Sequence, residues 1–599
     1  MLVGFDTEYG FSSCWRLPNG RLHGDLSTVQ PVCACLYFED GREVRIANRF
    51  EQLQPYFDDP RYTFLVHGAH AEFGFCRRVG VRFPIRFIDT LLMGLLVMHA
   101  LEFSMPGGTY KNAALAELAP RYGIPFISAG DKDLIRDSIM QLRHVEEFGI
   151  DRVLRYCLDD SRALVQLYPR LRDDMLRHCG PNAERNLTEL YQPYSLLLAE
   201  AARKGIRFDS ASWARLLDVA PKHRGQLLTT LRDYGYVHDG GGIGGRAFKC
   251  LIQRIGLAAE WPRTPTGELS TKEAFIKSAA ARYDHPALKA LQKLVGFDSF
   301  MGQDIGALVD GDGYIRCGIL PLAQRSSRNS TVSPNLMGIP RKLRPLLLPD
   351  KGCRFVHFDY SQQEPGVAGY LSKDAGLISD FSGGDVYLNL GRRLMLITHG
   401  MSDAQQREIR NKILKTLMLA IIYGKGCRSI AIDIKRPIRD AAVLLSNLHY
   451  AFPNLFAWLK GYVAMCMERG WAENILGFRA AFNVRDSRER GHVARSCQNF
   501  PIQSSAAACF QLTGLYLGQF GSDIRLPLHD AYLINVPDDP EALAEEEKRI
   551  LSATTNANNL LFPGLAVKRD IEFLGRFCKD GKEDSLEQLL TTLEAGGCP

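Results

Sequence analysis

Two aspartates in the second half of the sequence follow apolar segments in a way that suits metal-assisted phosphate chemistry. Asp359 stands near the end of the alternating segment 354–360, and Asp530 stands at the turn of a predicted hairpin over 526–536. If the two strands are neighbours, both carboxylates reach one sheet edge, where two hard cations could neutralise a transferring phosphate. Because a single aspartate at a strand end is usually a turn residue, the prediction depends on the pair.

A second set of carboxylates lies in the first 160 residues. Asp6 and Glu8 follow an apolar run and share one face of a predicted strand, because alternate residues of a strand point the same way. Glu72 follows another strand, and Tyr156 and Asp160 stand one turn apart on a predicted helix. Three acids plus a fourth with a helical tyrosine suit two metals and an activated water for phosphodiester hydrolysis.

A helix rich in cations is predicted between the two aspartates of the second half. Steps of four residues from Arg407 pass through Asn411, Lys415, Leu419 and Tyr423, which lie along one drifting stripe. A cation, an apolar side chain and an aromatic ring on one face could contact the phosphate, sugar and base of a nucleotide. The alternative is a buried helix whose long cationic side chains reach solvent.

Composition excludes several classes of protein. The 599 residues are 46% hydrophobic and 23% charged, which fits neither a disordered chain nor a membrane protein, and we expect a cytoplasmic protein that contacts no membrane. The net charge of +6 is uneven, because residues 201–350 hold 22 Lys and Arg against 13 Asp and Glu, and residues 401–500 hold 16 against 8. A basic half beside an acidic half suits a polyanion-binding protein with metal-binding carboxylates, although solvated helix faces are the alternative.

The elements that position these residues fall into three regions. Short apolar strands alternate with helices over the first ~170 residues, which indicates an α/β unit. Residues 185–305 are mostly amphipathic helix and predict an elongated helical arm. From residue 316 onward strands return on both sides of a helical insert, 386–494, which indicates a sheet platform with a helical lobe.

Five ordered motifs of the second half resemble those of the family A DNA polymerases, the group of bacterial DNA polymerase I. Three segments are similar, in order, to the family's motifs A, B and C. They are Asp359-Tyr360-Ser361-Gln362-x-Glu364, the helix from Lys415 to Tyr423-Gly424, and His529-Asp530. Arg328 and Asn335 are similar to positions of the family's arginine-led loop. Arg495, Asn499 and Gln503 are similar to positions of its primer- and template-contacting helix. The order and separations of the motifs also match the family.

The resemblance implies a role for each of these residues. Asp359 and Asp530 would bind two divalent metals, Mg²⁺ or Mn²⁺, together with the backbone of Tyr360, and Lys415 would hold the triphosphate as a catalytic residue. The other implied nucleotide contacts are Arg407, Arg410, Leu419, Tyr423, Gln362 and Glu364, of which Glu364 would obstruct a ribose 2′-hydroxyl. The implied primer-template contacts are Arg328, Asn335, Arg495, Asn499, Gln503 and His529.

The N-terminal carboxylates resemble the DEDDy type of 3′–5′ exonuclease. Asp6, Glu8 and Asp160 match its metal ligands, again for two divalent metals, and Tyr156 matches the tyrosine that orients the attacking water. Glu72, which we also expect to be catalytic, stands where the family has aspartate, one methylene shorter. Asp89 follows another strand and is expected to be a supporting residue.

Several positions depart from the polymerase pattern. Asn411 stands where the family has an arginine, and either Arg407, one turn earlier, or Arg410, rotated by about 100° in a regular helix, is the candidate replacement. Leu419 stands where relatives usually have Phe or Tyr, and Tyr387 where many have His. Ala531 follows Asp530 where a glutamate is common. None of these changes removes an expected metal ligand, so we expect activity with altered nucleotide selection.

The resemblance implies a multidomain fold of α/β and α+β parts, an RNase H-like exonuclease domain followed by a right-hand polymerase domain. The expected domains are an exonuclease over 1–178, a thumb over 185–320, a palm over 321–385 and 495–599, and fingers over 386–494. Expected partners are primer-template DNA and deoxynucleoside triphosphates, bound by a monomer whose processivity partner, if any, is not specified. With no 5′-nuclease region preceding the exonuclease, we expect a replicative enzyme resembling phage polymerases.

Three alternatives stay open. The first is a 3′–5′ exonuclease whose second half grips nucleic acid without synthesis, which the presence of Asp359, Asp530 and Lys415 argues against. The second is a single-subunit RNA polymerase, against which Glu364 and the N-terminal carboxylates argue. The third is a non-catalytic scaffold, which has no need of two sets of metal-type carboxylates.

Overall fold

The computed structural model describes residues 1–17, 22–101, 109–126, 129–236, 245–264, 266–301, 305–482, 489–578 and 585–594. The chain folds into two compact units. Unit 1 comprises residues 1–205, 317–337 and 356–573, and unit 2 comprises residues 206–316, 338–355 and 574–599. The division into exonuclease, thumb, palm and fingers stays a prediction. No helix among the described residues is long and apolar enough to span a bilayer.

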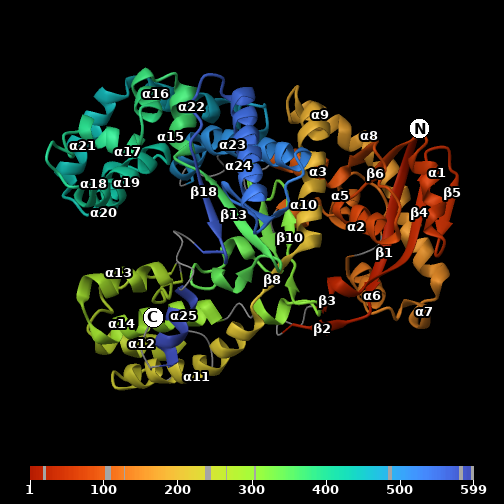
Figure 1. The fold of residues 1–599 in the computed structure, drawn as a ribbon, viewed down its shortest axis with the longest axis horizontal. Helices are drawn as coiled ribbons and strands as arrows, with labels where there is room; N and C mark the ends of the chain where they lie inside the picture. The colour runs from red at the N-terminus through yellow and green to blue at the C-terminus, as the bar shows by residue number, and fades with distance from the viewer. Residues whose placement is uncertain are drawn as a thin grey trace. The chain divides into compact units, whose positions relative to one another are not determined.

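A five-stranded mixed sheet forms the N-terminal part of unit 1 (Figure 1). Its order is β5 (Glu43–Ile46), β4 (Val29–Phe38), β1 (Leu2–Phe11), β6 (Thr63–Val66) and β7 (Phe87–Asp89). Strand β1 is antiparallel to β4 and parallel to β6. Val3 and Phe5 of β1 are fully buried, so the alternate side chains of Asp6 and Glu8 lie on the other face.

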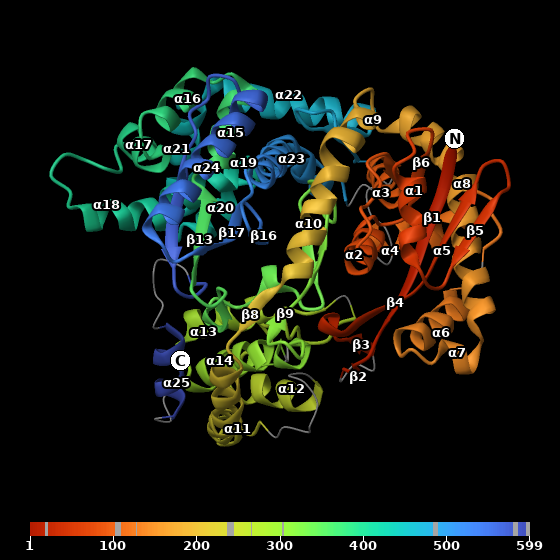
Figure 2. The ribbon, with the colours of Figure 1, turned by 45° about the vertical axis from the view of Figure 1, so that its right-hand side comes forward.

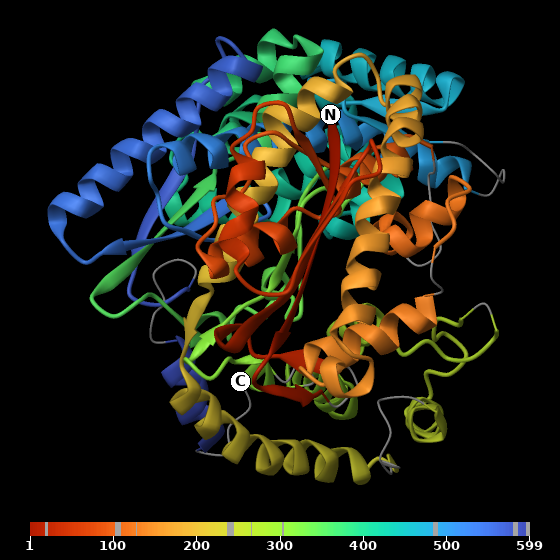
Figure 3. The same ribbon diagram turned by 90° about the vertical axis from the view of Figure 1, so that its right-hand side faces the viewer.

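Helices cover both faces of this sheet (Figures 2 and 3). The long helix α8 (Ile150–His178) packs on β1 and β4, and α2 (His70–Val79) packs on the same strands. The remaining elements of this part are β2 (Cys14–Arg16), β3 (Leu22–Gly24), α1 (Gln54–Phe57), α4 (Thr109–Ala113), α5 (Leu115–Arg121), α6 (Ala129–Met140) and α7 (His144–Glu147). This arrangement places the face of β1 that carries Asp6 within reach of α8.

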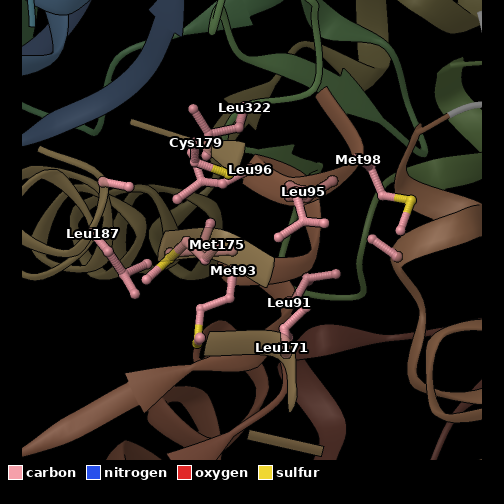
Figure 4. Packing of buried hydrophobic residues seen from close by; sticks show 14 of the residues in the cluster. Leu91, Met93, Leu95, Leu96, Met98, Leu171, Met175, Cys179, Leu187 and Leu322 are labelled. Carbon is pink, nitrogen blue, oxygen red and sulfur yellow. The ribbon is translucent and has the colours of Figure 1, made fainter. Parts of the chain in front are cut away.

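Helix α3 (Thr90–Leu101) is buried around almost its whole circumference. Its side chains pack with Leu171 and Met175 of α8 and with Leu187 and Leu322 from later segments (Figure 4). Phe478 and Cys497 extend the same hydrophobic cluster. A helix without a polar side needs cover on all sides, so one core joins the N-terminal sheet to the segments that follow it in unit 1.

A four-stranded sheet forms the second part of unit 1. Its order is β16 (Ile524–Leu528), β17 (Ala531–Pro537), β13 (Cys353–Tyr360) and β18 (Arg569–Leu574). Helices α23 (Arg490–Gln519) and α24 (Pro540–Leu561) pack against each other, and α24 contacts β17. The segments α9 (Ala183–Asn186), η3 (Leu187–Tyr191) and α10 (Gln192–Lys204) follow the N-terminal part in the chain. The short strands β10 (Gly318–Leu320) and β11 (Ser330–Val332) form a separate pair.

A helical segment follows β13. Its helices are α15 (Gln363–Ser372), α16 (Ala375–Ser382), α17 (Val386–Arg393), α18 (Asp403–Ile409), α19 (Lys415–Ile422), α20 (Cys427–Asp433), α21 (Ile438–Ala451) and α22 (Pro453–Arg469), and the hairpin β14 (Trp471–Glu473) and β15 (Arg479–Ala481) closes it. Between α18 and α19 the chain forms a π-helical turn, η7 (Arg410–Leu414), in which the Lys415 N–H donates to the Arg410 carbonyl.

Unit 2 combines a small sheet with a helical core. The sheet order is β12 (Leu347–Leu348), β8 (Ile206–Phe208) and β9 (Tyr314–Ile315). The helices are α11 (Ser210–Arg232), α12 (Gly245–Arg254), α13 (Glu273–Tyr283), α14 (Pro286–Met301) and α25 (Ser585–Glu594). Arg215 of α11 pairs with Glu587 and Glu594 of α25, both with N–O distances of 3.0 Å, so the C-terminal helix is held to this unit.

His99 is a buried histidine on α3 whose charge the fold disfavours. Its Nε2 lies 2.9 Å from the Leu322 carbonyl oxygen, and its ring meets Phe478 edge-on with centroids 5.7 Å apart. Burial lowers the pKa of His99 to about 4. The unfolded chain binds a proton at this residue near pH 6.5 and the folded chain does not, so stability should fall as the pH drops from 6.5 towards 4.

We predict that His99 alone makes the wild-type protein lose about 2 kcal/mol of unfolding free energy between pH 7.5 and pH 5. His99→Gln keeps a side-chain N–H but cannot titrate, so its stability should fall less over the same range. Thermal unfolding of both proteins at the two pH values measures the difference. An equal loss in the two proteins would contradict the prediction.

Candidate active sites

Strand β13 presents Asp359 on the face opposite to the core. Its neighbours Phe358 and Tyr360 are buried, and the Tyr360 hydroxyl lies 2.7 Å from Thr513 Oγ1 on α23. Because adjacent side chains of a strand point to opposite faces, burying these two rings fixes Asp359 on the open face, where it is half-buried.

Asp530 comes to the same place from the hairpin of β16 and β17. Leu528 pairs with Ala531, so His529 and Asp530 form a two-residue turn, with His529 exposed and Asp530 half-buried. The backbone N–H of Tyr360 donates to the Asp530 carbonyl, with an N–O distance of 3.1 Å. The strands that the sequence analysis required as neighbours are therefore adjacent in the sheet.

Tyr423, just after α19, lies against the turn that follows β13. Its hydroxyl donates to Glu364 Oε1 at 3.2 Å, and Gln503 Nε2 of α23 donates to the same hydroxyl at 2.9 Å. Arg328 Nη2 pairs with Glu364 Oε1 at 3.3 Å. Burial and the neighbouring Glu364 carboxylate raise the pKa of Tyr423. Four residues predicted from four separate motifs thus form one cluster.

Arg410 makes a second contact between this helical segment and the same turn. Its Nε donates to Asp385 Oδ2 at 2.7 Å, and Gln362 Nε2 donates to the same oxygen at 3.1 Å. Gln362 Oε1 in turn accepts from the Val386 N–H at 2.7 Å. Of the other predicted residues, Lys415 is exposed and Leu419 is half-buried. Arg407 is exposed, and it contacts no carboxylate in the part of the chain that the structure describes.

A cavity of about 490 Å³ lies beside Tyr423. Three more predicted residues, Arg495, Asn499 and Gln503, line it. Asn499 is only 7% exposed, and its Oδ1 has no hydrogen-bond partner among the described residues. A buried carbonyl oxygen without a partner is costly, so this atom is a candidate for accepting a hydrogen bond from a bound molecule.

Sequence reasoning missed Arg325, which also lines this cavity. Its guanidinium lies over the Phe482 ring, 5.3 Å from the centroid, and donates to the Ala481 carbonyl. Burial lowers the pKa of Arg325 to about 10. No signal in the sequence identified it, because its place in the cavity depends on how the chain folds around Phe482. Asn335, in contrast, is exposed beyond β11 and does not line this cavity.

A second cavity of about 570 Å³ is lined in part by Ser361 and Gln362 of the turn after β13. Gln362, Asp385, Lys568 and Arg569 are among its lining residues. Lys568 donates to the Gly384 carbonyl and lies over the Phe381 ring at 4.4 Å, and burial lowers its pKa. Neither Asp385 nor Lys568 was among the predicted site residues, because their place at this cavity depends on which strands pair.

In the N-terminal part, Asp6, Glu8 and Asp160 converge. One carboxylate oxygen from each lies within 4.8 Å of the other two. Asp6 and Glu8 share a face of β1, and Asp160, 5% exposed, reaches them from α8. Tyr156, one turn earlier on α8, is 8% exposed. Burial and the nearby carboxylates raise the pKa of Tyr156, so its hydroxyl keeps the proton.

Glu72 lies in the first turn of α2 and is 3% exposed. Burial and the nearby Asp6 carboxylate raise the pKa of Glu72 well above its usual range. The Asp89 carboxylate accepts from the backbone N–H groups of Gly68, Ala69 and Leu91 at 2.8–3.0 Å. These bonds hold the segment before α2 against the start of α3.

Both sites fit hard divalent cations. Each offers carboxylate oxygens, the ligands that Mg²⁺ and Mn²⁺ prefer. In the N-terminal site, carboxylates this close repel one another, and a divalent cation would relieve that repulsion. The donor sets therefore agree with the metals that the sequence predicts.

Comparisons with known proteins find bacterial DNA polymerases. The chain is 25% identical over 486 residues to the thermostable DNA polymerase I of Thermus thermophilus, a match covering 76% of this chain and 56% of that protein. It is 22% identical over 528 residues to DNA polymerase I of Synechocystis, covering 82% and 51%. The chain thus spans about half the length of these relatives.

A similar fold occurs in a solved structure, the POL domain of Pol1 from M. smegmatis in complex with DNA primer-template and dNTP. The TM-score is 0.70 at 20% identity, covering 92% of this chain and 93% of that chain. The family model for DNA polymerase family A matches residues 248–568, more than half of the chain and the region that contains Asp359, Lys415 and Asp530. The chain therefore belongs to DNA polymerase family A.

Proposed function

We propose that the protein is a template-directed DNA polymerase that extends a primer 3′ end, with a 3′–5′ exonuclease in its N-terminal part. The observation that supports synthesis most directly is the pairing of β13 with β17, which puts Asp359 beside Asp530. The N-terminal activity is supported by the convergence of Asp6, Glu8 and Asp160. DNA replication, and a likeness to phage enzymes, are part of this proposal.

In the polymerase site, Asp359, Asp530 and the backbone carbonyl of Tyr360 would hold two divalent metals, Mg²⁺ or Mn²⁺. When bound, these metals neutralise charge on the attacking oxygen and on the leaving pyrophosphate. Lys415 is exposed and available to bind the triphosphate. The remaining catalytic task of the chain is to hold primer and nucleotide in line.

Selection of deoxynucleotides is assigned to Glu364. Tyr423 and Arg328 both bond its Oε1, so the carboxylate is held in one position. A carboxylate fixed beside the sugar would exclude a ribose 2′-hydroxyl. The templating base and the primer-template minor groove are assigned to the cavity lined by Tyr423, Arg495 and Asn499.

In the exonuclease site, Asp6, Glu8 and Asp160 would hold two divalent metals, which supply an activated water when bound. Tyr156 keeps its proton and would orient that water by donating a hydrogen bond. Glu72 is buried beside Asp6, so its extra methylene is accommodated within the site. We expect the longer side chain to affect rate more than metal binding.

A primer-extension assay distinguishes the proposed function from the alternative, an exonuclease whose second half does not synthesise DNA. A labelled primer on a longer template is incubated with Mg²⁺, with and without the four deoxynucleotides, and resolved on a sequencing gel. Extension with nucleotides and shortening without them supports both activities. Shortening in both reactions favours the alternative, and extension without shortening argues against the exonuclease.

We predict that Asp359→Ala reduces extension by on the order of a thousandfold or more, because charge stabilisation at the reacting centre is lost. Degradation of single-stranded DNA should be unchanged, since Asp359 lies in the second sheet. Asp538→Ala, at an exposed position beyond β17, is the matched control and should extend normally. Extension by Asp359→Ala at the wild-type rate would contradict the assignment.

Asp6→Ala should have the opposite effect. Removing one of three converging carboxylates should abolish shortening of a single strand, again by about a thousandfold, while extension persists. The control is Asp159→Ala, which removes the exposed carboxylate next to Asp160. Digestion rates on labelled single-stranded DNA provide the measurement, and undiminished digestion by Asp6→Ala would exclude this site.

A further inference from the structure

The helix that precedes Tyr423 is not a regular α-helix at the place where it departs from the family. In η7 the Lys415 N–H bonds to the carbonyl of Arg410, five residues earlier, instead of to that of Asn411. A π-helical turn contains one more residue than an α-helical turn, so residues five apart share a face across it. Arg410, not Asn411, therefore lies one turn from Lys415 on the same face.

We propose that Arg410 is the second cation of the triphosphate site, brought into register with Lys415 by the π-helical turn, and that Asp385 is its positioning residue. The inference rests on the proposed polymerase function. It chooses between Arg407 and Arg410, the two candidates to replace the family arginine that is missing at Asn411. Asp385 had no role in the sequence analysis.

The contacts of Arg410 hold its guanidinium in one orientation. Nε donates to Asp385 Oδ2 at 2.7 Å, Nη1 donates to Asn411 Oδ1 at 2.8 Å, and the guanidinium carbon lies 5.1 Å from the Tyr387 ring centroid. The Arg410 side chain is 24% exposed. Asn411, the residue that stands in place of the family arginine, thus supports Arg410 instead of binding phosphate itself.

Asp385 is itself fixed from two sides. Its Oδ1 accepts from the N–H groups of Tyr387 and Leu388 and caps α17, while its Oδ2 accepts from Arg410 and Gln362. The Gln362 side chain continues this connection to the turn after Asp359. A guanidinium held in advance loses less side-chain entropy when it binds phosphate, which strengthens binding.

Arg407 lacks these features. It lies in the α-helical segment α18, eight residues from Lys415, which corresponds to roughly 12 Å along a helix axis. Its side chain is exposed, and in the described part of the chain no carboxylate orients it. Arg410 and Lys415, which are one turn apart, can therefore contact the same triphosphate more easily than Arg407 and Lys415 can.

The test measures dNTP affinity for the protein bound to primer-template DNA with a dideoxy-terminated primer, which requires no turnover. Arg410→Ala should weaken this affinity by on the order of tenfold to a hundredfold, as expected for a charge-assisted contact. The matched variant Arg407→Ala should change it less than about threefold. Equal losses in the two variants would overturn the assignment.

The double variant Arg410→Ala/Asn411→Arg tests the register directly. If the π-helical turn persists when nucleotide binds, an arginine at position 411 points away from Lys415 and affinity stays low. Recovery of wild-type affinity would show a regular α-helix in the bound state and would overturn the proposal. Unchanged melting temperatures show that all variants remain folded.

Asp385→Asn separates positioning from structure, because the amide oxygen can still cap α17 while the charge that holds Arg410 is lost. Steady-state extension should show a raised KM for dNTP with a smaller change in kcat, and a kcat loss with KM unchanged would overturn the positioning role. A wild-type protein that binds nucleotide without extending the primer would count against the proposed function alone. A wild-type protein that binds no nucleotide would overturn the inference.

Discussion

The second half of unit 1 depends on one constraint, the burial of Phe358 and Tyr360 on the core side of β13. That burial places Asp359 on the open face, and the bond from the Tyr360 N–H to the Asp530 carbonyl brings the second aspartate alongside. A hydrogen bond between the Tyr360 hydroxyl and Thr513 Oγ1, 2.7 Å apart, connects this face of the strand to α23. A one-residue slip of β13 would exchange its faces and remove Asp359 from the site.

The same strand end organises the nucleotide-contacting helix. Gln362 and Glu364, two residues apart just after Asp359, reach opposite ends of the segment from Arg410 to Tyr423. One connection runs through Asp385 to Arg410, and the other goes directly to the Tyr423 hydroxyl. These two connections join both ends of the segment to the turn that follows Asp359.

The N-terminal site depends on a different balance. Its carboxylates are close enough to repel one another, and burial adds to that cost, which is reflected in the raised pKa of Glu72. The fold sustains this arrangement with the backbone bonds to Asp89 and with the core around α3. Because α3 packs with α8 and with later segments, one hydrophobic cluster joins the N-terminal part of unit 1 to α23.

The sequence by itself determined which residues share a face. Alternation paired Asp6 with Glu8 and put Asp359 on the face opposite to Phe358 and Tyr360, and the spacing of four put Tyr156 beside Asp160, because these are local properties of regular strands and helices. It could not reveal the π-helical turn over Arg410–Leu414, since a period of 3.6 residues assumes an unbroken α-helix. Nor could it identify Asp385 or Arg325 as cavity-lining residues, or predict that Asn335 does not line the cavity beside Tyr423. Only the tertiary structure decided these, because strand pairing and burial depend on contacts between residues far apart in the chain, and the π-helical turn departs from the regular helical period.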